Sequence, residues 1–217
     1  LIDHTLLLAD ATEAQIQQLC REAKQYRFAS VCVHPTWVPL ARTLLVDSLV
    51  KVATVVGFPL GANTPEVKAF ETERAIQAGA HEIDMVINVG KLKDKDYQFV
   101  FEDLKSIADL SKKHLCTSKV ILETCLLSDE EKVIGCLLAK EARLNFVKTS
   151  TGFSKSGATV HDVALMKYVV GDKLQVKASG GIRSYEDSIA MINAGATRLG
   201  ASAGVKIIAG QKSESSY

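Results

Sequence analysis

The sequence predicts an α/β fold of the (β/α)₈ or TIM-barrel class, with all strands parallel. Three observations lead to this prediction. Short, apolar, β-branched segments alternate eight times with amphipathic helical segments, and such alternation gives parallel strands joined by right-handed crossovers. Neighbouring strand segments are never close enough in sequence to form a hairpin. The length of 217 residues also fits a compact barrel, because such barrels begin at about 200 residues.

The eight expected strands are short apolar runs, as strands covered by helices should be, and each ends at polar residues or glycine. In chain order they span residues 2–6, 30–33, 51–56, 82–88, 119–124, 145–148, 174–178 and 197–199.

Cap residues and apolar stripes place the helices between these strands. Thr12 with Gln15, and Ser128 with Glu131, match capping boxes. The helical stripes fall at 16–23, before about 45, between 65 and 79, at 97–108, 133–138, 160–170 and 185–192, and before 208.

One barrel domain is expected over residues 1–210, followed by a polar, flexible tail at 211–217. A partial internal repeat supports the barrel, because IQAGA at 76–80 and INAGA at 192–196 both read as helix ends that lead into a strand. The alternative architecture is an open doubly wound sheet. It is disfavoured because no G-x-G-x-x-G motif follows the first strand.

Composition excludes several classes of function. The formal net charge is +1 and no run of Lys or Arg exceeds two residues, so we expect no nucleic-acid partner and no anionic membrane surface. No apolar run approaches the roughly 18 residues that span a bilayer, and the start lacks the features of a signal peptide. The five cysteines form no C-x-x-C pair, which argues against a disulfide framework or a zinc site and for a reducing, cytoplasmic location.

Charged side chains at the expected strand ends point to chemistry on carbonyl compounds. The active site of such a barrel lies at the carboxyl ends of its strands, where Asp84, Lys148 and Lys177 are placed. Burial and a neighbouring like charge lower the pKa of a lysine, and a neutral amine attacks a carbonyl to form a Schiff base. Asp84 can then transfer protons. This is class I aldolase chemistry, for which we expect no metal or other cofactor.

The same three residues have a second interpretation, a buried ion network with a structural role only. The residues alone also leave open whether Lys148 or Lys177 is the nucleophile.

Glycine-containing loops follow the last three strands and suggest a phosphate site. Loops after strands seven and eight, with a helix N-terminus, bind phosphate in many barrels of this class. The candidates for this site are Thr151, Gly152, Gly180, Gly181, Gly200 and Ser202, with Arg183 as a source of charge.

Other polar residues carry weaker signals. Cys32 at the end of strand two either contacts substrate or acts as a small buried hydrophobe. Glu123 is a candidate partner for a lysine. Tyr217 is either disordered or a phenol folded over the barrel mouth. His4 and His34 have no partners at metal-ligand spacing, so we expect no metal site.

Seven motifs in the same order resemble the deoxyribose-phosphate aldolase family, over residues 2 to about 209. They are IDHTLL, VCVHP, VVGFPLG, EIDMVIN, VKTSTGF, VKASGGIR and LGAS. The resemblance implies reversible cleavage of 2-deoxy-D-ribose 5-phosphate into D-glyceraldehyde 3-phosphate and acetaldehyde, in deoxyribonucleotide catabolism. It thus implies a small sugar phosphate and an aldehyde as partners, and it is compatible with a homodimer.

The resemblance also implies roles for individual residues. Lys148 matches the Schiff-base lysine, Lys177 the lysine that perturbs it, and Asp84 the proton-transfer carboxylate. Asp3 and Thr5 match positions that bind substrate hydroxyls. Five residues match the phosphate-loop positions, namely Gly152, Gly180, Gly181, Gly200 and Ser202. Tyr217 matches a terminal tyrosine that assists proton transfer in some members.

Two positions depart from the pattern of some members of this family. Phe153 stands where some have lysine, and Ala203 stands where some have a second serine. Both changes remove polar contacts, so phosphate binding is expected to depend on backbone amides. The remaining alternatives are another lysine aldolase, a sugar-phosphate isomerase and a phosphate-binding barrel without catalysis. The intact Lys148, Lys177 and Asp84 argue against the last.

Overall fold

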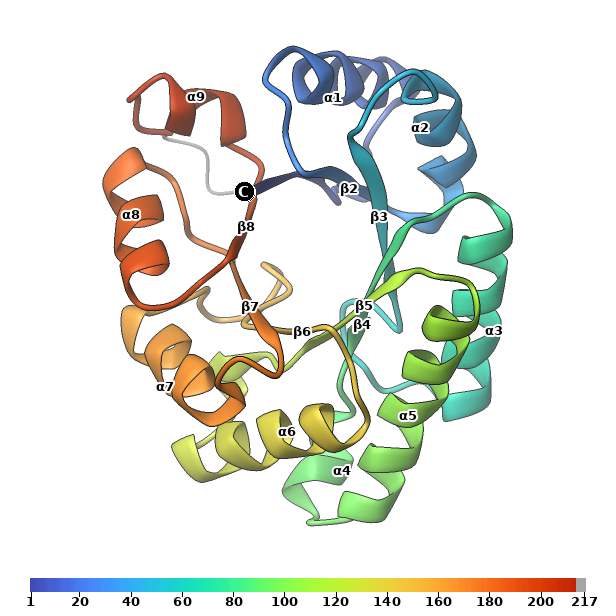
Figure 1. Ribbon diagram of the computed structural model, residues 1–217, viewed down its shortest axis with the longest axis vertical. Helices are drawn as coiled ribbons and strands as arrows, with labels where there is room; N and C mark the ends of the chain where they lie inside the picture. Colours follow the sequence, from blue (N-terminus) through green and yellow to red (C-terminus); the bar gives the residue numbers. More distant parts are fainter. Residues whose placement is uncertain (214–217) are drawn as a thin grey trace.

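The computed structural model describes residues 1–213 and forms a closed barrel of eight parallel strands (Figure 1). Each strand pairs with the next along the chain, and β8 pairs with β1. This closure confirms the barrel and excludes the open sheet. The strands are β1 (Ile2–Leu6), β2 (Ser30–Val33), β3 (Lys51–Val56), β4 (Glu82–Val86), β5 (Thr117–Ile121), β6 (Phe146–Lys148), β7 (Gln175–Ser179) and β8 (Arg198–Ala201).

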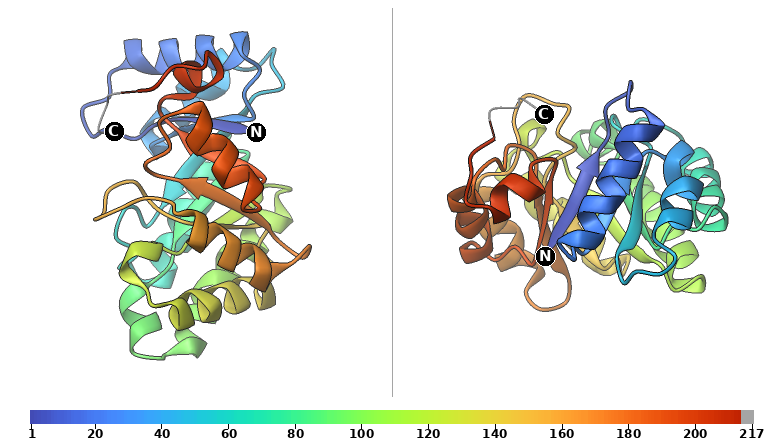
Figure 2. Two further views of the ribbon diagram at one scale, coloured as in Figure 1. Left: turned by 90° about the vertical axis from the view of Figure 1, so that its left-hand side faces the viewer. Right: turned by 90° about the horizontal axis from the view of Figure 1, so that it is seen from above.

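Helices form a layer outside the strands, as the three directions of view in Figures 1 and 2 show. Within residues 1–213 the α-helices are α1 (Glu13–Gln25), α2 (Val38–Leu44), α3 (Pro65–Gln77), α4 (Val89–Lys93), α5 (Tyr97–Lys113), α6 (Asp129–Glu141), α7 (Val160–Val170), α8 (Tyr185–Asn193) and α9 (Gly204–Ile208). Two 3₁₀ turns, η1 (Pro35–Trp37) and η2 (Thr124–Leu126), complete the elements. Across this part of the chain, no helix combines the length and apolar character needed to cross a membrane.

The cap signals in the sequence mark real helix ends. Both capping boxes form, at Thr12 before α1 and at Ser128 before α6. Gly79 and Gly195, the glycines of the internal repeat, have φ of +105° and +111°, in the left-handed region that glycine enters at little cost. A side chain at either position would also press against Arg42 or Lys167.

Five of the expected strands have different limits, and in β6, β7 and β8 each end differs by at most two residues. The changes in β4 and β5 have clear causes or consequences. β4 ends at Val86 because the Asn88 side chain accepts a hydrogen bond from the Lys91 amide and caps α4, a helix that the sequence reading missed. β5 begins at Thr117 and ends at Ile121. Glu123, expected at the end of strand five, instead has left-handed backbone angles (φ 57°, ψ 60°) that end the extended chain.

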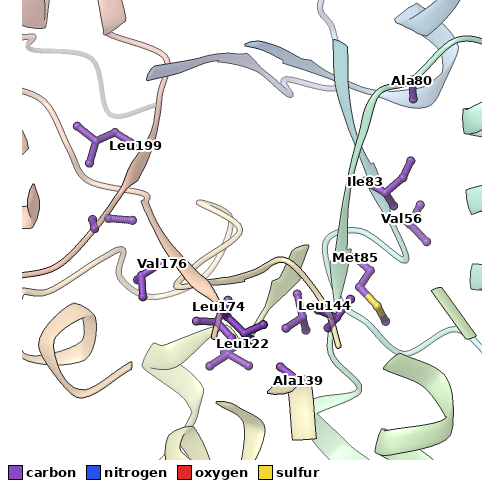
Figure 3. Close-up of a cluster of buried hydrophobic side chains, with 14 of the residues drawn as sticks. Val56, Ala80, Ile83, Met85, Leu122, Ala139, Leu144, Leu174, Val176 and Leu199 are labelled. Atoms are coloured by element: carbon purple, nitrogen blue, oxygen red, sulfur yellow. The ribbon is translucent and has the colours of Figure 1, made fainter. Parts of the chain in front are cut away.

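Apolar packing occurs on both faces of the strands. The larger cluster lies between the barrel and the helices, where Figure 3 shows residues such as Met85, Leu122 and Val176. Each fully buried aliphatic side chain there contributes about 1.5–3 kcal/mol. A smaller cluster lines the barrel interior along β1–β3 and includes Cys32 and Val55. Charged side chains occupy the rest of the interior, and they define the site.

The described part of the expected tail is fixed to the barrel. The Ser213 amide donates a hydrogen bond to the Arg183 carbonyl (2.9 Å), and Ser213 is buried. Tyr217 lies outside the described residues.

Candidate active site

Neighbouring strands bring the two candidate lysines together inside the barrel. β6 and β7 lie side by side, and Lys148 is directly opposite Lys177 in their register (Figure 1). Asp84 of β4 is likewise opposite Lys119 of β5. Because side chains alternate along a strand, these four residues share the inner face of the barrel. All four are at most 3% exposed.

One carboxylate holds three lysines. Asp84 Oδ2 lies 2.9 Å from Lys148 Nζ and 2.8 Å from Lys177 Nζ, while Oδ1 lies 2.6 Å from Lys119 Nζ. The structure therefore brings together Lys148, Lys177 and Asp84 as the sequence predicts. It also adds Lys119, which the sequence reading missed.

Ion pairs continue from Asp84 around a closed loop of alternating charge, which we name the charge ring. Its members in order are Asp84, Lys177, Asp3, Arg198, Glu82 and Lys119. The N–O distances are 2.8 Å for Asp84–Lys177, 2.6 Å for Lys177–Asp3, 2.6 Å for Asp3–Arg198, 3.3 Å for Arg198–Glu82, 2.6 Å for Glu82–Lys119 and 2.6 Å for Lys119–Asp84. Three cations thus balance three carboxylates, and Lys148 is an additional amine attached to Asp84, outside the ring.

This arrangement distinguishes the two candidate lysines. Burial disfavours the ammonium of both. Lys177 contacts both Asp3 and Asp84, which outweigh burial and raise its pKa well above the ordinary value. Lys148 contacts only a carboxylate that two other lysines share, so burial, with the charge of Lys177, lowers its pKa. The geometry therefore makes Lys148 the more readily deprotonated amine.

Two carboxylates of the ring, Asp84 and Asp3, stay ionised. Burial alone would raise the pKa of Asp84, but Lys119, Lys148 and Lys177 together hold it well below its usual range. The pKa of Asp3 is lowered in the same way against burial, chiefly by Lys177. Asp84 is thus an anion that can relay a proton between two amines but does not store one.

A cavity opens above Lys148 at the carboxyl ends of the strands. Its lining includes Lys148, Thr5, Thr151, Gly152, Gly180, Gly181, Arg183, Gly200 and Ser202. The candidate phosphate loops therefore share one cavity with the candidate nucleophile, and Thr5 lies there too.

Two of the glycines in this cavity are required by close contacts. Gly180 has φ of +81°, and a side chain there would meet the Gly157 backbone at 3.0 Å. A side chain on Gly200 would lie 3.0 Å from Lys177 Cε. Gly200 thus gives Lys177 room to reach the barrel interior, besides exposing backbone to the cavity.

Asp3 and Cys32 do not line the cavity. Both are fully buried beneath it, Asp3 in the charge ring and Cys32 in the interior apolar cluster. Burial raises the pKa of the Cys32 thiol, which is therefore neutral. Ser30 Oγ donates a hydrogen bond to Asp3 Oδ1 (2.7 Å), which helps to fix that carboxylate.

Glu123 contacts a loop residue and not a lysine. Its carboxylate accepts hydrogen bonds from the hydroxyl and the amide of Thr151, next to Gly152. Burial raises the pKa of Glu123. It therefore holds the loop that follows Lys148.

Lys119, Glu82 and Arg198 are the members of the charge ring that sequence reasoning missed. The signal was available for two of them, because Glu82 is two residues before Asp84 on its strand, and Lys119 lies on the next strand. For Arg198 the required information was the pairing of β8 with β1, which places it near Asp3.

Within residues 1–213, one group has metal-ligand spacing, and it lies outside the barrel. Asp129, His161 and Asp162 come together where α6 meets α7. Lys132 Nζ already pairs with Asp129 (2.9 Å) and with Asp162 (2.6 Å) and occupies the centre of the group.

Comparisons with known proteins identify the family of the chain. A family model described as DeoC/LacD family aldolase matches residues 1–210. The chain is 61% identical over 218 residues to a deoxyribose-phosphate aldolase of Halalkalibacterium halodurans, covering all of this chain and 97% of the relative. It is 59% identical over 217 residues to one of Clostridium perfringens, covering all of this chain and 96% of the relative.

Solved structures show the same likeness. A deoxyribose-phosphate aldolase from Aeropyrum pernix, described as having a unique tetrameric structure, is 34% identical with a TM-score of 0.90. The match covers 96% of this chain and 88% of that one. A structure described as QR15, an aldolase, is 40% identical with a TM-score of 0.90, over 94% of this chain and 91% of that one.

Proposed function

The chain belongs to the DeoC/LacD family of aldolases, and from this premise we propose that it cleaves 2-deoxy-D-ribose 5-phosphate through a Schiff base on Lys148. The products are D-glyceraldehyde 3-phosphate and acetaldehyde, and the reaction serves deoxyribonucleotide catabolism. The observation that carries the choice of nucleophile is the position of Lys148 on the cavity floor, attached to a charge ring that is already balanced.

The chemistry begins with the neutral amine of Lys148. Its nitrogen attacks C1 of the open-chain sugar, and loss of water gives an iminium. When the C3 hydroxyl loses its proton and the C2–C3 bond breaks, the electron pair of that bond moves into the iminium and forms an enamine. C3 becomes the aldehyde carbon of glyceraldehyde 3-phosphate, which leaves. A proton then adds to C2 of the enamine, and water releases acetaldehyde and restores the amine.

Asp84 and Lys177 supply the proton transfers of this sequence. Lys177 is held as an ammonium 2.8 Å from Asp84 Oδ2, and the same oxygen lies 2.9 Å from Lys148. A proton can move from Lys177 by way of Asp84 toward the hydroxyl that leaves as water, and it can return when the imine is hydrolysed. Asp3 keeps Lys177 in place and favours its charged form between the transfers.

The phosphate binds against the loops that follow β7 and β8. Gly180, Gly181 and Gly200 expose backbone there, and Ser202 adds a hydroxyl. Arg183 lines the same cavity and provides a cation. Thr5 is placed to contact a substrate hydroxyl, whereas the burial of Asp3 supports an indirect role for that carboxylate.

Trapping of the Schiff base tests the proposed nucleophile. Acetaldehyde and a borohydride are added, and the modified peptide is identified by mass spectrometry. We expect an N-ethyl group on Lys148. An adduct on Lys177 alone would reverse the two roles, and the absence of any adduct would overturn the Schiff-base proposal altogether.

Location and assembly extend the proposal. The five cysteines are all free, which supports a cytoplasmic location. We propose a homodimer of single-domain barrels (residues 1–210). Light scattering coupled to size exclusion tests this, and the mass of a monomer or of a tetramer would contradict it.

A further inference from the structure

We propose that Glu82 and Arg198 are positioning residues that complete the charge balance of the ring and thereby leave Lys148 as the amine without a proton. Neither residue lines the cavity or contacts Lys148. The inference rests on the proposed function and extends it to the opposite end of the barrel from the substrate.

The positions of the two residues show why they matter. Glu82 is the first residue of β4 and Arg198 the first of β8, so both lie at the amino-terminal ends of the strands. Arg198 Nη1 lies 2.6 Å from Asp3 and 3.3 Å from Glu82, and Glu82 lies 2.6 Å from Lys119. Among the ion pairs of residues 1–213, they thus form the second connection, besides Asp84, between the Asp3–Lys177 side and the Lys119 side.

An aromatic ring supports the two cations on these sides. Lys119 Nζ lies 5.8 Å and Arg198 Cζ 5.4 Å from the centre of the Phe146 ring. Contacts of this kind stabilise cations that are shielded from water. Phe146 is two residues before Lys148 on β6, so the strand that carries the nucleophile also packs against the charge ring.

Charge balance links these distant residues to Lys148. With Arg198 present, the ring contains three cations and three carboxylates and has no net charge. Loss of the Arg198 charge would leave the ring with an excess carboxylate, and Lys148 would keep its proton as the compensating cation. Loss of the Glu82 charge would have the opposite effect, because excess cations repel a proton on Lys148.

Other titratable groups near Lys148 do not supply a charge that could take the place of the ring carboxylates. The titratable groups that face it from the surrounding elements are Asp84 of β4, Lys177 of β7, Cys32 of β2 and Glu123 after β5. Cys32 is neutral, and Glu123 is held by Thr151 and has a raised pKa. The ring carboxylates therefore decide the charge of Lys148.

The test is the pH dependence of imine formation in three variants, Arg198→Met, Glu82→Gln and the double variant. The rate of trapping by acetaldehyde and cyanoborohydride at Lys148 is measured against pH, because acetaldehyde has no group that titrates, whereas a sugar phosphate titrates near pH 6. The rate rises as Lys148 loses its proton, so the rising limb reports its pKa.

We expect opposite shifts in the two single variants. R198M should move the rising limb to higher pH, and E82Q should move it to lower pH, each by roughly half to one pH unit. The double variant restores charge balance and should return the limb close to its wild-type position. Arg198→Lys keeps the charge and should also keep the limb in place. Lys132→Met, which removes a cation from the Asp129–Asp162 group outside the barrel, is the matched control and should cause no shift.

Several results would overturn the inference. Shifts of the same sign, or lower rates without any shift, would show that the two residues act on packing only. Single variants that fail to fold would identify the ring as an element of stability and would equally reject the proposal. Wild-type protein that forms no adduct would instead reject the proposed function, so the two failures can be told apart.

Discussion

The barrel interior and the interface between α3 and α5 both bury lysines against carboxylates, yet burial has opposite results in the two places. At the helix interface, Lys68 Nζ lies 2.5 Å from Asp103 Oδ2 and 3.0 Å from the Val86 carbonyl, and both side chains are fully buried. Burial lowers the pKa of Lys68 and raises that of Asp103, although their mutual attraction opposes both shifts. In the charge ring, by contrast, burial is outweighed at Asp84 and Lys177.

The difference comes from the number of opposite charges that each ion contacts. Lys68 has one carboxylate, and the second oxygen of that carboxylate, Asp103 Oδ1, is buried without a hydrogen-bond partner among the described residues. Lys177 contacts two carboxylates. The desolvation cost of an isolated buried ion pair is therefore about equal to the attraction between its ions, whereas a second opposite charge keeps an ion such as Lys177 charged. Lys148 is as buried as the members of the charge ring, but it shares its carboxylate with two other lysines. Both conditions favour a neutral, reactive amine.

The largest expected effect comes from Lys148→Met, which should separate activity from stability. Cleavage should fall by at least about a thousandfold, because the covalent intermediate cannot form. The free energy of unfolding should stay equal or rise by up to about 1 kcal/mol, because a buried amine that the charge balance of the ring does not need is replaced by an apolar side chain. Steady-state kinetics and urea unfolding measure the two quantities. A large loss of stability would show that Lys148 belongs to the structural ring.

Lys68→Met should show the reverse. It leaves the Asp103 carboxylate buried without a partner, so we expect a loss of about 3–5 kcal/mol in the free energy of unfolding. Activity per folded molecule should be retained, because Lys68 lies outside the cavity and the ring.

The double variant K68M/D103L is the control for that prediction. It removes both charges, so much of the stability should return. Equal destabilisation of the single and double variants would mean that packing around Lys68, and not the unpaired carboxylate, caused the loss.

Lys177→Met tests how far the two lysines differ. Cleavage should fall by about 10²–10³-fold, because a proton donor is lost while the nucleophile remains. Lys148 would then lose a repelling neighbour and gain a larger share of Asp84, so its pKa should rise and the rising limb of the pH–rate profile should move to higher pH. An unmoved limb would contradict the electrostatic role of Lys177, even if the rate falls.

The sequence predicts the barrel well because each element is encoded locally. Capping residues such as Thr12 and Ser128 form hydrogen bonds with the first turn of the helix that they precede. Gly79 forms the turn after α3 because its backbone adopts a positive φ. Errors occur where a side chain overrides propensity, as when Asn88 caps α4 and shortens an apparent strand.

The site is predicted less completely, because the charge ring depends on contacts between strands far apart in sequence. Asp3 and Arg198 meet only because the barrel closes. The two interpretations left open by the sequence, a catalytic lysine and a structural ion network, also prove compatible. The charge ring has the geometry of a structural ion network, and Lys148, which is attached to the ring, has the geometry of a catalytic lysine.

The smallest expected effect concerns the ring as a source of stability, and it depends on pH. The pKa of Asp3 is lower in the folded state than the ordinary value of about 3.9, so its ionised form stabilises the fold at every pH above that value. Asp3→Asn should therefore reduce the free energy of unfolding by about 1–3 kcal/mol at pH 7. As the pH falls below about 4, wild-type protein loses this contribution as well, and the two unfolding free energies should converge.

Asp103 provides the contrast within the same titration. Its pKa is raised in the folded state, so the ionised form costs stability, and lowering the pH through the folded pKa relieves that cost. Lowering the pH therefore reduces the stabilisation that Asp3 provides and removes the destabilisation that Asp103 causes. Unfolding of wild type, D3N and K68M/D103L from pH 7 to pH 3 measures both. A difference between wild type and D3N that persists unchanged at pH 3 would show that Asp3 stabilises the barrel by its shape and hydrogen bonds and not by its charge.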